Sequence, residues 1–148
     1  MAMVREMHPE AALQAADGKP LPLDEELARS MLHRAIVPNR NSEGLPAWIG
    51  LAVGPEQVLG SVYLSLETTW YSPQPILVER WLFVRPQHRR SNIAATLIEF
   101  AKKSADAAKV TLIFGHMSSG REAVKQRFYR RHVGPQIGGY YAHHGGVV

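Results

Sequence analysis

Four polar or basic residues, Arg89, Arg90, Ser91 and Asn92, stand where one sequence pattern ends and another begins. An apolar run ends at Val84, and an apolar pattern with helical spacing follows Asn92. The first turn of a helix leaves backbone N–H groups without partners and carries partial positive charge. A strand that turns directly into a helix aims these donors at an anion, and two arginines would add charge-assisted hydrogen bonds. The segment therefore predicts either an anion site or a basic, solvated turn.

Asn92 and Ala94 fit the close approach of a ligand to this turn. We expect the turn to need a residue that tolerates a left-handed backbone, and asparagine is the best choice after glycine. Ala94 is small enough for a ligand or a neighbouring backbone to come near. Both residues are compatible with a bound anion, but neither excludes an ordinary basic turn.

The elements that must position the turn are predicted from the spacing of apolar residues and from turn residues. Strands are expected over 3–9, 47–53, 58–70, 76–84, 110–115 and 138–144. Helices are expected over 22–36, capped by Asp24, from Asn92 to Ala108, and over 118–132. The segments 37–46 and 71–75 are expected to be loops, and 54–57 a hairpin turn.

The order of these elements predicts the fold class. A strand, a helix and a second strand follow one another between Leu77 and Phe114, which favours a parallel strand pair within a mixed sheet. The continuously apolar run 110–115 predicts a strand buried on both faces. We expect an α/β (α+β) fold, one domain over residues 1–148, with helices on both faces of the sheet.

Composition narrows the class of protein. The chain has 148 residues, 45% hydrophobic and 20% charged, with a formal net charge of +4. It has no cysteine, which excludes disulfides and cysteine nucleophiles and suits the cytoplasm, where we expect the protein. The first ten residues lack the apolar core of a signal peptide, and no apolar run approaches the roughly 20 residues that span a bilayer. His143 and His144 would point to opposite faces of a strand, so no metal site is expected.

The segment "VRPQHRRSNIAATLI" resembles the acetyl-CoA-binding segment of the GNAT N-acetyltransferase superfamily. Asn92 stands where the family usually has glycine. A second segment, "RFYRRHVG", keeps the family's tyrosine at Tyr129, but His132 and Val133 stand where Gly-Phe is common. The segments around Trp70, Glu79 and Arg89 are most similar to small GNAT proteins of bacteriophages or prophages. The residues that match the first segment are Val84, Pro86, Arg89, Asn92, Ile93, Ala94 and Leu97.

The resemblance implies a GNAT-like sheet and acetyl-CoA as cosubstrate, with no metal. It implies that the pyrophosphate lies over the backbone N–H groups of the turn and that the pantetheine arm runs beside the end of the preceding strand. The residues expected to bind acetyl-CoA are Leu82, Phe83, Val84, Arg89, Arg90, Ser91, Asn92, Ile93 and Ala94.

The resemblance also implies direct attack of an amine on the acetyl thioester, which needs a base and an acid. Glu79 is the candidate base, because its carboxylate interrupts an otherwise apolar strand. An exposed ion-paired Glu79 is the alternative. Tyr129 is the candidate acid for the departing thiolate, and the alternative is that Phe128 and Tyr129 only pack the helix against the sheet.

Three functions therefore stay open: an N-acetyltransferase, a GNAT-like protein that binds acyl-CoA without catalysis, and a basic nucleic-acid-binding domain. The acetyltransferase is favoured, and nucleic acid is the least favoured partner. The expected partners are acetyl-CoA and an amine that the sequence does not identify. A homodimer is compatible with the sequence, and no membrane partner is expected.

Overall fold

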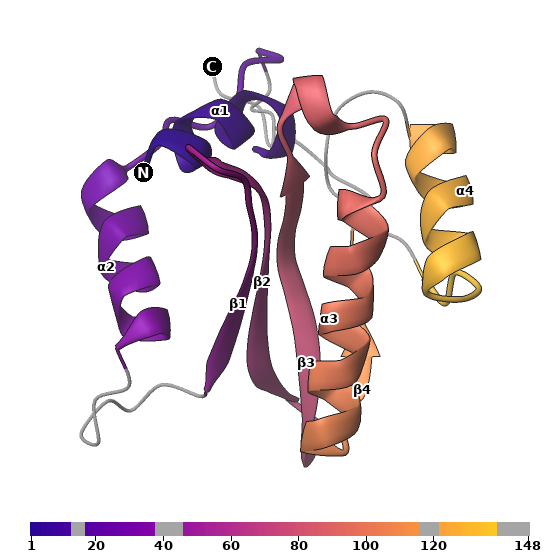
Figure 1. Ribbon diagram of the computed structural model, residues 1–148. Helices are drawn as coiled ribbons and strands as arrows, with labels where there is room; N and C mark the ends of the chain where they lie inside the picture. The colour runs from indigo at the N-terminus through magenta and orange to yellow at the C-terminus, as the bar shows by residue number, and fades with distance from the viewer. Residues whose placement is uncertain (13–16, 38–45, 116–121, 139–148) are drawn as a thin grey trace.

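A four-stranded sheet in the order β1-β2-β3-β4 forms the centre of the computed structural model, which describes residues 1–12, 17–37, 46–115 and 122–138 (Figure 1). The strands are β1 (Ala47–Val53), β2 (Val58–Thr69), β3 (Ser72–Val84) and β4 (Thr111–Ile113). The helices are α1 (Ala2–Ala11), α2 (Glu25–Ile36), α3 (Ile93–Ala108) and α4 (Glu122–His132), with a short 3₁₀ turn over Pro86–His88.

The sheet is mixed, as the sequence predicted. β1, β2 and β3 form an antiparallel meander, while β3 and β4 run parallel, joined by α3. The β2–β3 register shifts between Tyr63 and Leu64, because Tyr63 pairs with Trp81 whereas Leu64 pairs with Glu79. Arg80 is therefore the extra residue of a β-bulge, which lies directly beside Glu79.

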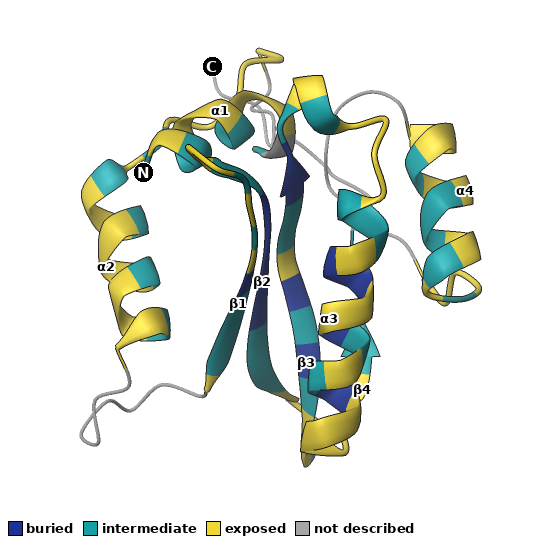
Figure 2. Ribbon diagram, in the orientation of Figure 1, coloured by how far each residue is buried: buried dark blue, intermediate teal, exposed yellow. Residues whose placement is uncertain are grey.

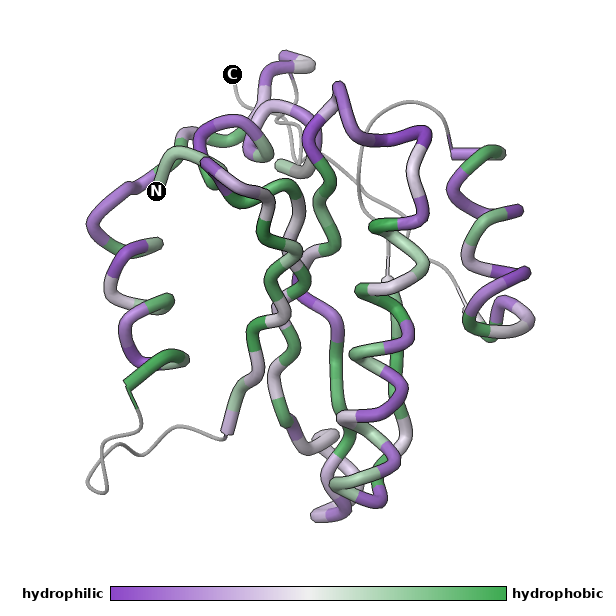
Figure 3. The backbone as a smooth tube through the Cα atoms, viewed as in Figure 1, coloured by the Kyte–Doolittle hydropathy of each residue, from purple (hydrophilic) through white to green (hydrophobic). Residues whose placement is uncertain are grey.

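The core lies between the sheet and α3. Val62, Leu64 and Leu77 are completely buried and pack with Leu97 and Ala101 of α3 (Figure 2). Full burial of one such aliphatic side chain contributes about 1.5–3 kcal/mol, so these residues fix the register of β2 and β3 against the helix. The hydropathy along the chain agrees with this location of the core. β2, β3 and α3 carry most of the hydrophobic positions, and α4 is largely hydrophilic (Figure 3).

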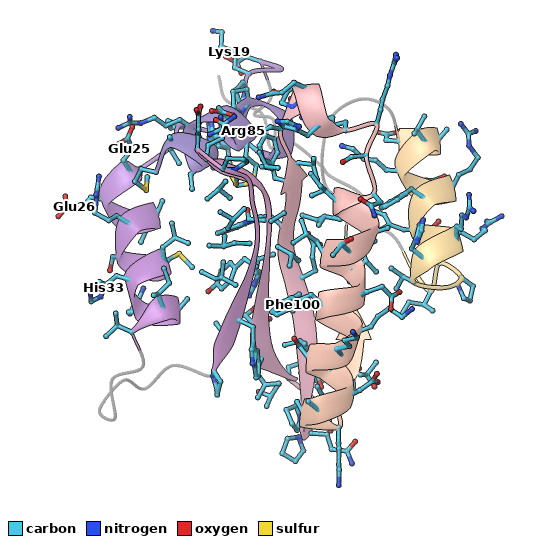
Figure 4. All side chains as sticks on the ribbon, viewed as in Figure 1. Lys19, Glu25, Glu26, His33, Arg85 and Phe100 are labelled. Atoms are coloured by element: carbon cyan, nitrogen blue, oxygen red, sulfur yellow. The ribbon has the colours of Figure 1, made fainter. Side chains whose placement is uncertain are left out.

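Helices cover both faces of the sheet, with α2 beside β1 on one face and α3 on the other (Figure 1). Gly50 of β1 allows the close approach of α3, because a Cβ atom there would lie 2.7 Å from Cδ1 of Phe100. The Phe100 ring lies between α3 and the sheet (Figure 4). The absence of a side chain at Gly50 therefore sets the helix-to-sheet distance.

Helix α2 begins where the sequence predicts. The carboxylate of Asp24 accepts a hydrogen bond from the backbone N–H of Leu27 at 2.9 Å, and Glu25 and Glu26 occupy the first turn. Helix α3 also begins as predicted, after Asn92, and ends at Lys109 in a left-handed conformation (φ 55°). Acidic residues at the start of α2 stabilise it through the helix dipole.

The predicted first strand over 3–9 is wrong, because this segment is helix α1. Its half-buried residues are Met3, Val4, Met7 and His8, which is helical and not strand spacing. Pro9 lies inside the last turn of the helix and removes the N–H group that would donate to the carbonyl four residues earlier.

Two further boundaries differ from the prediction. The expected loop 71–75 belongs mostly to β3, and the turn between β2 and β3 is at Trp70 and Tyr71. Pro73 and Pro75 are tolerated because β4 pairs with β3 only from Ile76 onward.

The strand predicted over 110–115 is shorter, because β4 contains only Thr111–Ile113. Its residues are exposed or half-buried and not buried on both faces, because in the described structure β4 pairs with β3 alone. The predicted strand 138–144, most of the loop 37–46 and the predicted helix start at 118–121 lie outside the described residues.

Candidate functional site

The N-terminus of α3 presents backbone donors without partners. Ile93 N–H donates to the Ser91 hydroxyl at 3.3 Å, and that hydroxyl donates to the His88 carbonyl at 2.6 Å. The N–H groups of Arg90, Asn92, Ala94 and Ala95 make no hydrogen bond with the described residues. These donors and the positive end of the helix dipole meet the requirement for an anion site that the sequence predicted.

The role expected of Asn92 needs a correction. Its backbone has φ −85° and ψ 4°, which is not the left-handed conformation that we expected of it. Its carbonyl accepts the first helical hydrogen bond, from Thr96 N–H at 3.0 Å, and its side chain makes no capping bond. Asn92 thus begins the helix, and its replacement of the family's glycine puts no strain on the backbone.

The two arginines of the turn lie in different surroundings. Arg90 is exposed and has no ion pair with any described residue. Arg89 instead donates through Nε to the Val84 carbonyl at 3.0 Å and through Nη2 to both carboxylate oxygens of Glu10 at 2.9 and 2.7 Å. The structure therefore leaves Arg90 available to an anion and holds Arg89 between β3 and α1.

The end of β3 is open on the side where a parallel partner would lie. The β3–β4 pairing consists of Ile76–Thr111, Leu77–Leu112 and Val78–Ile113 and then stops. Residues 79–84 have no strand partner on that side within the described ranges, although β2 continues to pair with them on the other side. The open edge includes Leu82, Phe83 and Val84 and leads directly into the turn before α3 (Figure 1).

Glu79 is a buried carboxylate at the point where β3 and β4 separate. It is 8% exposed and lies on the same face of β3 as the fully buried Leu77. Burial raises the pKa of Glu79 to about 8, although a hydrogen bond from the backbone N–H of Gly115 opposes the rise. The alternative of an exposed, ion-paired Glu79 is therefore wrong: Arg80 pairs with Glu67, while Glu79 is enclosed.

Tyr129 of α4 lies near Glu79. Its ring is 5.6 Å from the ring of Phe114, the residue directly after β4 and next to Gly115. Burial raises the pKa of the Tyr129 phenol above its ordinary value, and the negative charge of Glu79 adds to the rise. Tyr129 as a whole is half-buried. A phenol with a raised pKa stays protonated at neutral pH and can donate a proton.

Two contributors were missed from the sequence. Gly115 supplies the N–H donor to Glu79, and no residue-type signal marks a backbone donor. Glu10 holds Arg89, and its spacing of four from Glu6 on a helix would have been a signal had 3–9 been recognised as helical. Trp70 and Tyr71 do not contribute to the site: they are 96% and 72% exposed in the turn between β2 and β3.

Other features lie away from this site. An open hollow of about 400 Å³ is located beside α3 and β1, and none of the candidate residues lines it. Within the described ranges, no three His, Asp or Glu side chains are grouped as a metal site requires. None of the described helices has the length and apolar character needed to cross a membrane. The residues that line the hollow are Trp48, Phe100, Lys103, Ser104, Ala107 and Ala108.

Residues 47–132 match the family model described as "Acetyltransferase (GNAT) domain". This range is more than half of the chain and contains the turn, Glu79 and Tyr129. The protein therefore belongs to the GNAT acetyltransferase family, as the resemblance implied. No curated protein matches the chain.

Solved structures with the same fold include several acetyltransferases. The apo aminoglycoside 6'-N-acetyltransferase AAC(6')-IG from Acinetobacter haemolyticus has 19% identity and a TM-score of 0.59, with 86% of this chain and 85% of that chain covered. AAC(6')-Iy in complex with the bisubstrate analogue CoA-S-monomethyl-acetylneamine has 13% identity and a TM-score of 0.58, with 84% and 81% covered. A ribosomal-protein-alanine N-acetyltransferase from Brucella melitensis biovar Abortus 2308 has 15% identity and a TM-score of 0.53, with 65% and 69% covered. At these identities the likeness establishes the GNAT fold.

Proposed function

We propose that this protein is an acetyltransferase that binds acetyl-CoA along the open end of β3 and transfers the acetyl group to a primary amine. One observation carries the proposal: the edge of β3 that no described strand pairs with joins a buried carboxylate, Glu79, to N–H groups at the start of α3 that have no partner in the described part of the chain. A single extended ligand with an anionic part and a reactive end would contact both.

The residues present fit acetyl-CoA. The pyrophosphate would accept hydrogen bonds from the backbone N–H groups of Arg90, Asn92 and Ala94, with Arg90 adding a charged donor. The pantetheine arm carries amide groups that can pair with the open backbone of Leu82–Val84 as an added strand does. Because Arg89 is bonded to Glu10, we assign it to holding the turn and not to the phosphates.

The proposed reaction is a direct transfer. The neutral amine attacks the thioester carbonyl carbon, a C–N bond forms, and the C–S bond then breaks. The amine loses one proton, and the CoA thiolate gains one, so the reaction needs no other reactant. Ionised Glu79 takes the proton, directly or through water, and the Tyr129 hydroxyl gives one to the thiolate.

The ionisation of Glu79 decides the pH at which this chemistry is fast. With a pKa of about 8, only about a tenth of the Glu79 carboxylates are ionised at pH 7 in the free protein. We therefore expect kcat/KM to rise steeply from pH 7 to pH 9. The amine also loses its proton as the pH rises, so the contribution of Glu79 is the part of the rise that disappears in Glu79→Gln.

The experiment that tests the function measures CoA released from acetyl-CoA in the presence of a panel of amines. The panel contains an aminoglycoside, a polyamine, a peptide with a free N-terminal alanine and a lysine peptide, and the proposal expects at least one of them to increase CoA release. CoA binding without transfer to any amine would favour the acyl-CoA-binding protein. Binding of DNA without binding of CoA would favour the nucleic-acid-binding domain.

A further inference from the structure

Helix α1 contacts the turn before α3 through two acid–arginine pairs of matching spacing. Glu6 and Glu10 are one helical turn apart on α1, and Arg85 and Arg89 are equally spaced at the end of β3 and in the turn. Glu10 lies 2.7 Å from Arg89 Nη2, and Glu6 lies 3.2 Å from Arg85 Nη2. The region where these elements meet is marked by Arg85 in Figure 4.

Arg89 is held on three sides. Besides both oxygens of Glu10, its guanidinium contacts the Val84 carbonyl through Nε at 3.0 Å, and its Cζ lies 5.6 Å from the centroid of the Phe83 ring. Phe83 and Val84 are the last two residues of β3 and are buried. Arg89 thus connects the first helix of the chain with the end of the strand that leads into the anion-binding turn.

The turn has few other restraints. From Pro86 to Asn92 its remaining hydrogen bonds within the described structure are local, such as Ser91 N–H to the His88 carbonyl at 3.2 Å and Arg89 N–H to the Pro86 carbonyl at 3.4 Å. The long-range hydrogen bonds of Arg85, to the Leu59 carbonyl at 2.9 Å and to the Gln57 side chain at 2.6 Å, lie before this segment. A site made of backbone donors binds tightly only if those donors are already held in place, because ordering them on binding costs affinity. The Glu10–Arg89 contact supplies a long-range restraint at this position.

We infer that Glu10 is a positioning residue of the acyl-CoA site: through Arg89 it holds the turn so that the N–H groups of Arg90, Asn92 and Ala94 face the pyrophosphate. This inference rests on the proposed function, because it assumes that the turn binds CoA. Glu10 does not contact the ligand. It acts on affinity and not on the chemical step.

A matched control exists on the same helix. Arg5 of α1 donates through Nε and Nη2 to the two carboxylate oxygens of Glu25 of α2, both at 2.7 Å, whereas Arg89 reaches both oxygens of Glu10 through Nη2 alone; in each pair one arginine contacts both oxygens of one carboxylate. Both pairs are partly exposed, and each contributes little to global stability. Glu10→Gln and Glu25→Gln remove the same charge from similar contacts of α1, but only the first contact reaches the turn.

The test measures CoA affinity by titration calorimetry, and KM and kcat for acetyl-CoA, in the parent protein and both variants. Glu10→Gln is expected to raise the Kd for CoA and the KM roughly three- to tenfold, with kcat nearly unchanged. Glu25→Gln is expected to change neither, and thermal melts check that both variants are folded at the assay temperature. Equal Kd values for the two variants, or tighter binding by Glu10→Gln, would overturn the inference.

A double-mutant cycle identifies the route of the effect. If Glu10 acts only through Arg89, Glu10→Gln added to Arg89→Gln should weaken CoA binding no further than Arg89→Gln alone. Additive losses would mean that Glu10 acts on its own and would overturn the inference. If the parent protein itself binds no CoA, the proposed function fails first, and this outcome is distinct from parent binding that Glu10→Gln leaves unchanged.

Discussion

Replacing Glu79 by glutamine should make the stability of the protein less dependent on pH. Glu79 is 8% exposed and lies beside the fully buried Leu77, and burial raises its pKa to about 8. The folded protein therefore holds this carboxyl group in its neutral form until the pH is high. Glutamine has nearly the same shape, is neutral at every pH, and retains an oxygen that can accept the hydrogen bond from Gly115 N–H.

The magnitude follows from the two pKa values. The ordinary value is 4.5, so between pH 4.5 and about 8 the unfolded chain has lost a proton that the folded protein keeps. Over this range, each pH unit lowers the free energy of unfolding by about 1.4 kcal/mol. The stabilising contribution of neutral Glu79 is complete below pH 4.5 and is lost as the pH rises. From pH 5 to pH 7 the parent should lose roughly 2–3 kcal/mol relative to Glu79→Gln.

The assay is urea denaturation of both proteins at pH 5, 6 and 7, with the free energy of unfolding extrapolated to water. The histidines titrate in both proteins, so their contribution cancels in the difference between parent and variant. We expect this difference to change steadily with pH in favour of Glu79→Gln. A difference that is the same at all three pH values would refute the reasoning, because Glu79 would then be ionised in the folded protein already at pH 5.

Three further predictions concern the site and the core. In kinetic assays Glu79→Gln should lower kcat/KM and remove the part of its rise with pH that Glu79 contributes, while CoA affinity stays the same, and an unchanged profile would exclude Glu79 as the base. Tyr129→Phe should slow acetyl transfer roughly tenfold to a thousandfold with little change in CoA affinity, and equal rates would mean that water protonates the thiolate. Gly50→Ala should lower the free energy of unfolding by roughly 1–3 kcal/mol, because its Cβ would lie 2.7 Å from Phe100 Cδ1. Gly138→Ala, whose Cβ would meet no atom of the described residues within 4 Å, is the control, and similar losses in both variants would contradict the steric explanation.

Periodicity predicted the parts of the fold that are built from long patterns. The change from strand to helical spacing at Asn92 located α3 correctly, and with it the parallel pairing of β3 and β4. Helix α2 was predicted from Asp24 and its acidic first turn. These signals are local, because a capping residue and an apolar stripe act within a few residues of each other.

Helix α1 and the exact ends of β3 and β4 were not predicted, since they depend on distant contacts. The α1 segment contains Pro9, and its acidic residues pair with Arg85 and Arg89, which are far away in the sequence. No local pattern shows that Arg89 turns toward Glu10 while Arg90 forms no ion pair with the residues that the structure describes. The enclosure of Glu79 likewise depends on where β3 and β4 separate, which is a property of the assembled sheet.

The central claim is that the backbone N–H groups at the start of α3 bind the pyrophosphate of CoA. Its most direct test is calorimetric titration of CoA into the parent protein, Asn92→Ala and Asn92→Pro. The Asn92 side chain makes no capping bond, and its φ of −85° is near that of proline. Asn92→Ala keeps the N–H group and should bind CoA like the parent, whereas Asn92→Pro removes this donor and should lose most of the affinity while its thermal midpoint stays close to that of Asn92→Ala. Equal CoA affinity in all three proteins would contradict the claim.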